Sequence, residues 1–425
     1  MHCTNFTTLM IKRILLSVSL FMSLVAHAQN GTPSIYSFYG IGEVTFRGSV
    51  ENRSMGGVAV FTDSIHINLQ NPASYGSLKV TSFSVAATNN KTRFVTNSVN
   101  DNAGRTSIDY LAFAIPISKK FGAGIGVLPY SSVGYKLQTL ASGTNTNNRR
   151  YEGSGGLNRV FFSLAYNFSE NLSFGTDLQY NFGQIETSTL ATIEGVQFGS
   201  REVSLSALSG FTFNTGFMYR RKVGKKNTLY SSITYTPGTS INLNNSRSIA
   251  TVLIGANTEN IQSETEVIVP DSKLKMPQRI TFGAGFGEER HWLIGAELAL
   301  TSNNGFANRF DDIQNVNYEN GTKISFGGYF IPKYTAFNGY FNRVTYRAGA
   351  RFEQSGLVVN GKNIEDKAVT FGLGLPLRGT FSNINLGCEL GKRGTKAAGL
   401  VEERYTNISI SLSLNDRWFV KRKYD

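Results

Sequence analysis

The stretch Val160–Phe182, VFFSLAYNFSENLSFGTDLQYNF, decides the fold class. In its first half every second residue is large and apolar or aromatic, and the positions between them include Ser163 and Asn167. Successive side chains of a β-strand point to opposite faces, so this alternation predicts a strand with one apolar face. A short SEN segment follows, and 172–182 repeats the alternation. The stretch therefore predicts two antiparallel strands joined by a tight turn.

The same alternation recurs along most of the chain and defines about fourteen segments. Their approximate spans are 80–89, 106–117, 121–135, 157–168, 171–184, 203–221, 228–239, 274–287, 290–301, 322–331, 342–354, 366–376, 381–392 and 403–416. A soluble sandwich shows this pattern with its apolar face inward, whereas an outer-membrane barrel turns that face towards lipid.

Three features favour the barrel. The apolar bands are about 9 to 11 residues long, which is the length that a tilted strand needs to cross a bilayer. Aromatic residues gather at band ends, as in the girdles of such barrels. The connections alternate between short turns, apart from a longer one at 331–342, and long polar segments. The long segments are 89–106, 131–155, 184–202, 240–272, 302–321 and 356–366. We predict an all-β, transmembrane antiparallel barrel of about 14 strands over residues 80–425.

The beginning of the chain predicts export to the outer membrane of a Gram-negative cell. A basic pair precedes the apolar run 14–25, and the small-residue motif AHA ends at Ala28. The run is short for a membrane anchor, so residues 1–28 are interpreted as a cleaved signal peptide, with Met10 as an alternative start.

Composition narrows the function classes. The net charge is +13, and for an exported protein this charge points to outer-membrane lipids and away from nucleic acid. Cys3 lies in the leader, which leaves Cys388 without an internal disulfide partner. The remaining histidines, His66 and His291, have no metal-ligand spacing, and no G-x-S-x-G motif occurs. We therefore expect no enzyme activity, metal or cofactor.

Residues 29–79 precede the first strand and lack its alternation. Glycines permit tight backbone turns there, Asn-Pro marks a turn, and several apolar residues are available to pack. A compact segment before a wide barrel predicts a plug, or hatch, folded into the lumen, and its apolar content argues against a disordered tail. The residues that we expect to form this plug are Arg53, Met55, Gly56, Gly57, Asp63, Asn71, Pro72 and Ala73.

The lumen of such a barrel is too wide for its own side chains to fill. The alternation places five charged residues on the inward face: Asp177, Glu297, Arg347, Arg351 and Glu389. Two interpretations stay open. The charges form a mutually paired lining, plug contacts included, or they contact a ligand.

Pro129 interrupts the segment 121–135. Proline cannot donate to a β-ladder, so it predicts a bulge, kink or local gap in the wall. Gly126 and Pro129 would then mark a lateral opening. Alternatively, the strand ends at Leu128 and Pro129 begins the loop.

Several segments together resemble the FadL/TodX-type outer-membrane transport family. They include YSFYGIGE (36–43), RSMGG (53–57), NPASYG (71–76), GVLPYSSVGY (126–135) and MPQRITFGAGF (276–286). The resemblance implies a fourteen-stranded barrel with an amino-terminal hatch, passive uptake of hydrophobic compounds such as long-chain fatty acids, and lateral release through a kinked third strand. The PorV-like branch of this scaffold implies a partner of a protein secretion machine.

Two functions follow as expectations. In the first, the chain is a hatch-gated outer-membrane channel for a hydrophobic small-molecule ligand. In the second, it is a plugged barrel that does not transport but docks a protein partner through its long extracellular loops, as an assembly component of a secretion or biogenesis complex.

Overall fold

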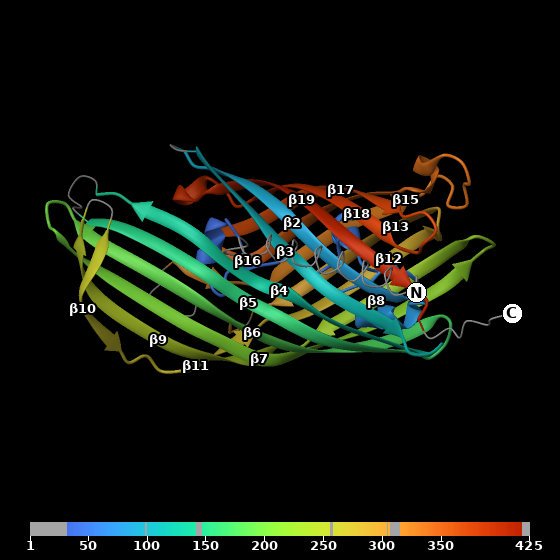
Figure 1. The fold of residues 1–425 in the computed structure, drawn as a ribbon, viewed down its shortest axis with the longest axis horizontal. Helices are drawn as coiled ribbons and strands as arrows, with labels where there is room; N and C mark the ends of the chain where they lie inside the picture. The colour runs from blue at the N-terminus through green and yellow to red at the C-terminus, as the bar shows by residue number, and fades with distance from the viewer. Residues whose placement is uncertain are drawn as a thin grey trace, which may run out of the picture.

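The structure is a computed structural model that describes residues 32–97, 100–141, 147–255, 258–303, 305–306 and 315–418. The predicted signal peptide lies outside these residues. Nineteen strands form one continuous antiparallel sheet. One of them, β1 (Glu43–Val44), lies inside the barrel, and the other eighteen build fourteen wall strands because three wall strands are interrupted (Figure 1). The predicted fold is confirmed.

Eleven wall strands are uninterrupted: β2 (Thr81–Val95), β3 (Asn100–Pro116), β4 (Phe121–Thr139), β5 (Asn147–Asn167), β6 (Leu172–Ile193), β7 (Phe198–Val223), β13 (Trp292–Ser302), β16 (Thr345–Val359), β17 (Lys362–Pro376), β18 (Asn383–Arg393) and β19 (Glu402–Asp416). The interrupted ones are β8 (Asn227–Thr236) with β9 (Thr239–Ile254), β10 (Glu259–Val267) with β11 (Ser272–Met276) and β12 (Gln278–Glu288), and β14 (Val316–Tyr318) with β15 (Gly321–Phe330).

The last strand closes the wall against the first. β19 pairs with β2 from Glu402↔Val95 to Asp416↔Thr81. Closure matters because hydrocarbon offers no hydrogen-bond partner to a free strand edge. Among the described residues, no helix is long and apolar enough to cross a membrane.

The alternation sorts side chains as expected for a lipid-facing wall. On β5, Phe162 is 47% exposed on the outer face, whereas its neighbour Ser163 is 0% exposed on the inner face. The buried apolar residues lie inside the barrel, where Val58 and Val60 of the amino-terminal segment pack with Leu293 of the wall. The core therefore sits between this segment and the wall.

The long polar segments were wrongly predicted as loops. Much of 131–155, 184–202 and 240–272 is strand, and β5, β6, β7, β9 and β10 extend far beyond the rest of the wall (Figure 1, left). These extensions reach past the apolar band, so few apolar residues point outward from them, whereas Ile185, Ile241 and Leu243 are buried on the inner face with Ile41 of the amino-terminal segment. They therefore lack the alternation by which strands were predicted.

The opposite rim carries the short turns, which face the periplasm in barrels of this class. One connection there is longer, as expected, and contains the 3₁₀-helix η3 (Tyr340–Arg343). The other rim carries the short helix η4 (Ala397–Gly399), in the connection between β18 and β19.

Candidate functional site

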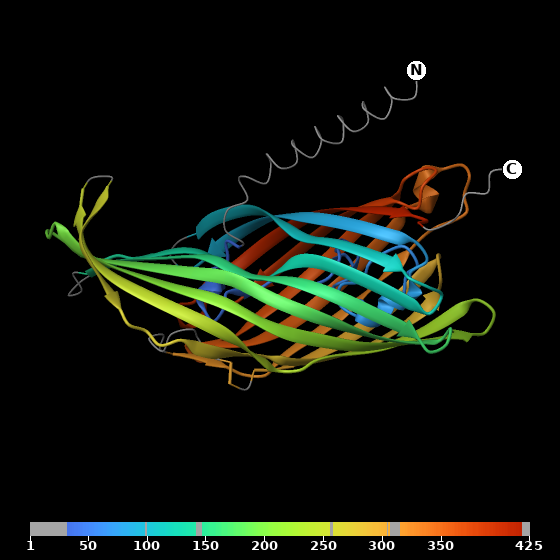
Figure 2. The ribbon, with the colours of Figure 1, turned by 60° about the horizontal axis from the view of Figure 1, so that its bottom comes forward.

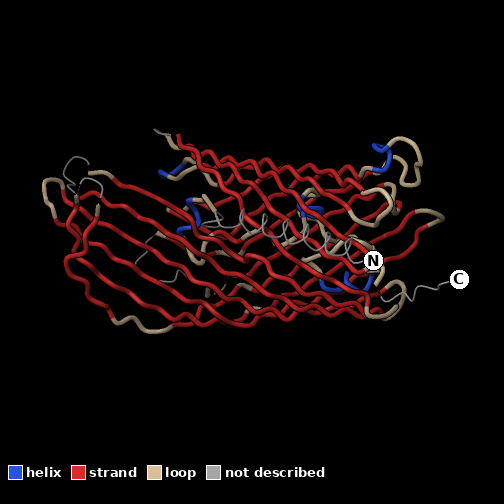
Figure 3. Tube along the Cα trace, viewed as in Figure 1, coloured by secondary structure: helices blue, strands red, loops and turns tan. Residues whose placement is uncertain are grey.

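Residues 32–80 lie inside the barrel, as the blue segment in Figure 2 and the central helices in Figure 3 show. They form η1 (Ile35–Phe38), β1, α2 (Val50–Arg53) and η2 (Pro72–Ser77). We call residues 32–47 the upper part and residues 49–80 the lower part of this lumenal segment.

The lower part begins at a capped helical turn. The Ser49 hydroxyl accepts a hydrogen bond from the Asn52 backbone N–H at the start of α2. Arg53 ends the turn and donates to Asp109 Oδ2 (3.1 Å), Ser409 Oγ (2.9 Å) and Thr88 Oγ1. One guanidinium thus joins α2 to β2, β3 and β19.

Met55, Gly56 and Gly57 follow α2 and press against the wall. Gly56 and Gly57 have positive φ, a conformation that favours glycine. The Gly56 N–H donates to Thr370 Oγ1 at 2.9 Å. A Cβ added to Gly327 of β15 would lie 2.1 Å from the Met55 carbonyl oxygen, and one on Gly349 of β16 only 2.3 Å from the Gly56 nitrogen. The segment therefore fills the space beside these wall glycines.

Asn71, Pro72 and Ala73 make the same kind of contact on the opposite wall. Asn71 caps η2 by accepting from the Ala73 N–H at 3.0 Å and donates to the Phe217 carbonyl at 3.3 Å. A Cβ on Gly175 would lie 2.4 Å from the Pro72 carbonyl carbon. Ala73 is fully buried. Backbone packed on glycine thus holds the lower part at β6 as well as at β15 and β16.

Asp63 lies between these two contacts and pairs with His66. The Asp63 carboxylate accepts from the Ile65 N–H at 3.0 Å and lies 2.6 Å from His66 Nδ1. Burial alone would raise the pKa of Asp63 and lower that of His66, but the ion pair reverses both effects. It lowers the pKa of Asp63 to about 2 and raises that of His66 above its usual value.

The upper part pairs with β4 where β3 no longer does. The ladder between β3 and β4 runs only from Leu111↔Val127 to Pro116↔Gly122. Beyond it, β1 pairs with β4 through Val44↔Ser131. The upper part therefore lines the inner side of a gap in the wall.

Gly126 and Pro129 lie where this ladder ends. β4 continues to Thr139 and bulges against β5 between Pro129 and Ser131, so the interpretation in which the strand ends at Leu128 is wrong. The Pro129 carbonyl accepts from the Thr45 hydroxyl at 2.5 Å, and the Tyr130 carbonyl accepts from the Thr45 N–H at 3.0 Å. The bulge thus attaches the upper part to the wall.

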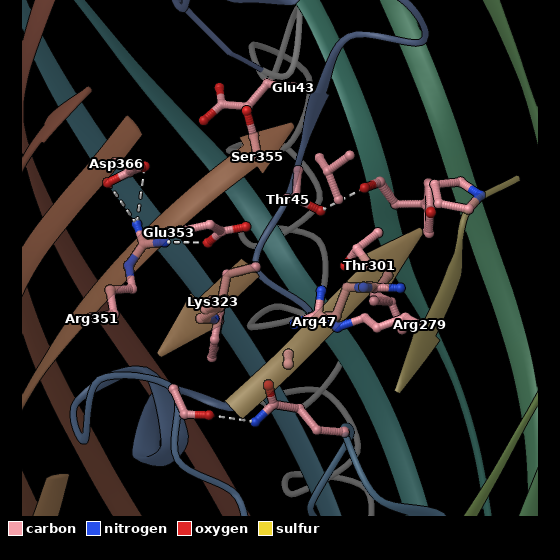
Figure 4. Close-up of a pocket in the computed structure, with 18 of the residues that line it drawn as sticks. Glu43, Thr45, Arg47, Arg279, Thr301, Lys323, Arg351, Glu353, Ser355 and Asp366 are labelled. Carbon is pink, nitrogen blue, oxygen red and sulfur yellow. Dashed lines mark hydrogen bonds and ion pairs between the residues drawn. The ribbon is translucent and has the colours of Figure 1, made fainter. Parts of the chain in front are cut away.

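A cavity of about 410 Å³ lies between the lumenal segment and the wall (Figure 4). All five residues predicted to face inward lie on the lumenal face. Arg351 donates to Glu389 (2.9 Å), and the Glu297 carboxylate accepts from the Ala59 N–H (2.7 Å). Arg347 donates to Asn385 at 3.0 Å, and Asp177 accepts from Asn214 at 3.2 Å. The lining is thus partly self-paired and partly bonded to the segment.

The charges of the cavity divide into two groups. In the first, which we call the paired group, three arginines contact six carboxylates. Its members are Arg53 with Asp109, Arg351 with Glu353, Glu389 and Asp366, and Arg393 with Asp366, Glu43 and Glu403. These residues come from the segment, β3 and β16 to β19.

The second group, which we call the cationic group, lies mainly on β5, β12 and β15. It contains Arg47, Arg159, Arg279 and Lys323, and among the described residues none of the four forms an ion pair with a carboxylate. These residues were not among those predicted to line the lumen. The alternation could have placed three of them there, because Arg159, Arg279 and Lys323 each precede an outward apolar residue.

Comparisons with known proteins agree with this architecture. The family model of BamG matches residues 10–425. The fold is similar to that of the toluene transporter TbuX of Ralstonia pickettii, with a TM-score of 0.58 and 14% identity over 87% of this chain and 99% of that chain. It is also similar to the P. putida toluene transporter TodX, with a TM-score of 0.56 and 14% identity over 88% of this chain and 100% of that one.

A FadL homologue of Pseudomonas aeruginosa gives a TM-score of 0.54 and 10% identity over 88% of this chain and 98% of that one. At these identities the similarity concerns the fold alone, and to that extent the expected FadL/TodX resemblance is confirmed. No curated protein matches the sequence.

Proposed function

The chain belongs to the BamG family, and on that premise we propose that it is an accessory barrel of the machinery that assembles outer-membrane proteins. The match of the family model over residues 10–425 is the observation that carries this proposal. It favours the second of the two expected functions, in which the plugged barrel serves a protein partner.

The anchoring of the lumenal segment supports a structural role for the barrel. The segment bonds to β2, β3 and β19 through Arg53 and to β17 through Gly56, and its backbone packs directly on wall glycines. Release of the lower part would break all of these contacts together. A fixed segment of this kind suits a barrel that binds its partner through its outer surfaces and does not open its lumen.

The longer periplasmic turn, residues 331–344, is the surface that we assign to the partner. Phe337 is fully exposed and Phe341 is 73% exposed. The turn, orange in Figure 2, is nevertheless ordered. The Lys333 N–H donates to the Asn342 carbonyl at 2.8 Å, and the Arg343 guanidinium lies over the Tyr340 ring. Ordered, exposed aromatic rings are typical of the centres of protein interfaces.

The test is co-purification from native outer membranes after gentle extraction of a tagged, full-length chain. We expect a component of the assembly machinery in stoichiometric amount. The double variant Phe337→Ser, Phe341→Ser should reduce its yield at least about tenfold, because buried aromatic anchors dominate interface energy. Val196→Ser, at an exposed apolar position on the opposite rim, is the matched control. Recovery of the barrel without such a component would overturn the proposal.

A second candidate function, passive transport of a hydrophobic compound, is supported by one observation. The ladder between β3 and β4 is short, and the upper part lines the gap that it leaves. Lipid analysis of the purified chain separates the two functions. A hydrophobic compound bound in stoichiometric amount, together with uptake that stops when the gap is cross-linked, would favour transport.

A further inference from the structure

Two members of the cationic group, Arg159 and Arg47, share one aromatic ring, and Lys323 lies over the neighbouring Phe46 ring. The Arg159 guanidinium lies 4.2 Å from the centre of the Tyr130 ring, and the Arg47 guanidinium lies 5.3 Å from the same centre. Arg47 is also close enough to repel both Arg159 and Arg279. Figure 4 shows Arg47 and Arg279 side by side in the cavity, with Lys323 facing the same space. Four cations from three strands and the segment thus crowd together.

The nearest carboxylates are engaged elsewhere. Glu353 is paired with Arg351 at 3.1 Å, Glu297 accepts from the Ala59 N–H at 2.7 Å, and Asp177 accepts from Asn214 at 3.2 Å. Glu353 and Glu297 still attract Arg279 and Lys323. Because both carboxylates are bonded elsewhere, the four clustered cations keep an excess of positive charge, which raises the free energy of the folded state. A bound anion would remove this repulsion.

We propose that Arg47, Arg159, Arg279 and Lys323 bind a phosphate-bearing anion in the cavity. Guanidinium groups match phosphate because their N–H donors form two parallel hydrogen bonds to its oxygens, and a lysine adds a point charge. Arg159 is already oriented, because its Nε donates to Asn181 Oδ1 at 2.8 Å and its plane lies on Tyr130. The cavity of about 410 Å³ holds a phosphate group with room for a substituent. This site does not depend on the proposed assembly role.

The experiment measures phosphate binding to the full-length chain, purified in a maltoside detergent at low ionic strength. Inorganic phosphate should bind saturably, by titration calorimetry, at one site. Arg279→Gln and Arg47→Gln should each weaken binding about tenfold or more, because each removes charge-assisted hydrogen bonds. Arg149→Gln makes the same change on an exposed residue of β5 and should leave binding unchanged. Arg47 lies outside the wall, so Arg47→Gln tests the site even if Arg279→Gln prevents barrel folding.

A second probe distinguishes the two sources of phosphate. Short-chain phosphatidic acid that binds at least about tenfold more tightly than inorganic phosphate would identify a lipid headgroup, whereas equal affinity would identify a free phosphate. Either result supports the site. Absence of saturable binding of both probes at about 10 mM would overturn it. Equal loss of binding in Arg149→Gln and Arg47→Gln would overturn it too, because the anion would then respond only to net charge.

Discussion

The two parts of the lumenal segment are held in different ways. The lower part places its backbone directly on glycines of β6, β15 and β16, so its position is set mainly by shape, with the ion pair between Arg53 and Asp109 in addition. The upper part meets one wall glycine, Gly134 of β4, where an added Cβ would lie 2.1 Å from the Thr32 carbonyl oxygen. Otherwise it is held mainly by ion pairs and by hydrogen bonds to β4, where it takes the place of a neighbouring wall strand. The first kind of contact cannot loosen gradually, because a backbone either fits against a glycine or clashes with a side chain.

This difference indicates which part can respond to its surroundings. Charge pairs and single hydrogen bonds change with pH, salt and bound ions, whereas steric fit does not. The upper part also lines the wall gap and, through Arg47, the proposed anion site. We therefore expect any conformational change on binding of a ligand or partner to occur in residues 32–47. The lower part should stay in place.

The largest predicted effect is steric. Gly349→Val should displace Met55 and Gly56, because even a Cβ would lie 2.3 Å from the Gly56 nitrogen. We expect a loss of at least about 3 kcal/mol in the free energy of unfolding, measured by urea titration of the barrel in detergent. Ala348→Val adds a similar volume on the outward face of the same strand and should have little effect. Equal stability of the two variants would show that the lower part is not held by shape.

The second effect is electrostatic. Arg393→Gln removes the partner of Glu43 (2.5 Å) and Asp366 (3.0 Å) and leaves Glu403 buried without its cation. The Arg393 side chain is 17% exposed, so we expect a loss of about 2 kcal/mol, somewhat below that for a fully buried pair.

A double variant isolates the charge contribution to that loss. Adding Glu403→Gln to Arg393→Gln should restore part of the stability, since it removes the uncompensated carboxylate. Lys392→Gln, at an exposed neighbouring position, is the control. If Lys392→Gln is as destabilising as Arg393→Gln, the upper part is not held by the buried network.

Sequence alone predicted the wall and the location of the plug segment but not the contacts between them. Alternation is a local signal, and it placed strands such as 160–168 and inward charges such as Arg351 and Glu389. It could not pair Arg393 with Glu43, because that contact joins residues far apart in the chain. It also missed β1, since two residues are too few to alternate. The strand extensions that reach past the apolar band were missed because they carry no continuous outward apolar face.

A smaller effect is expected at the wall gap. Thr45→Val removes the hydroxyl that donates to the Pro129 carbonyl, which should cost about 1 kcal/mol of local stability. The measurable result is faster hydrogen exchange in residues 128–135 of β4. Thr45→Ser keeps the hydroxyl and should exchange as the wild type does. If exchange is unchanged in Thr45→Val, the upper part does not support β4.

The smallest effect tests whether the lower part is insensitive to pH. Because the pKa of His66 is raised in the folded state, protonated His66 stabilises the fold fully at pH values below its unfolded-state pKa, near 6.5. This stabilisation is lost as pH rises through the folded-state pKa. Ionised Asp63 stabilises the fold at pH values above its unfolded-state pKa, near 3.8. This stabilisation is lost as pH falls towards its folded-state pKa of about 2. Stability from the pair should therefore decline as pH rises from about 6.5 through the raised pKa of His66.

The decline should stay below about 1 kcal/mol, because the Asp63 side chain is 48% exposed and the buried Nε2 of His66 has no partner among the described residues. Glu51 favours and Arg347 opposes protonation of the same imidazole. His66→Gln should abolish the decline in melting temperature over this range, and His291→Gln, on the periplasmic rim, should preserve it. If the melting temperature of His66→Gln still declines over this range, the pH dependence comes from the upper part, where ionic contacts dominate. The two parts would then differ more than the present contacts indicate.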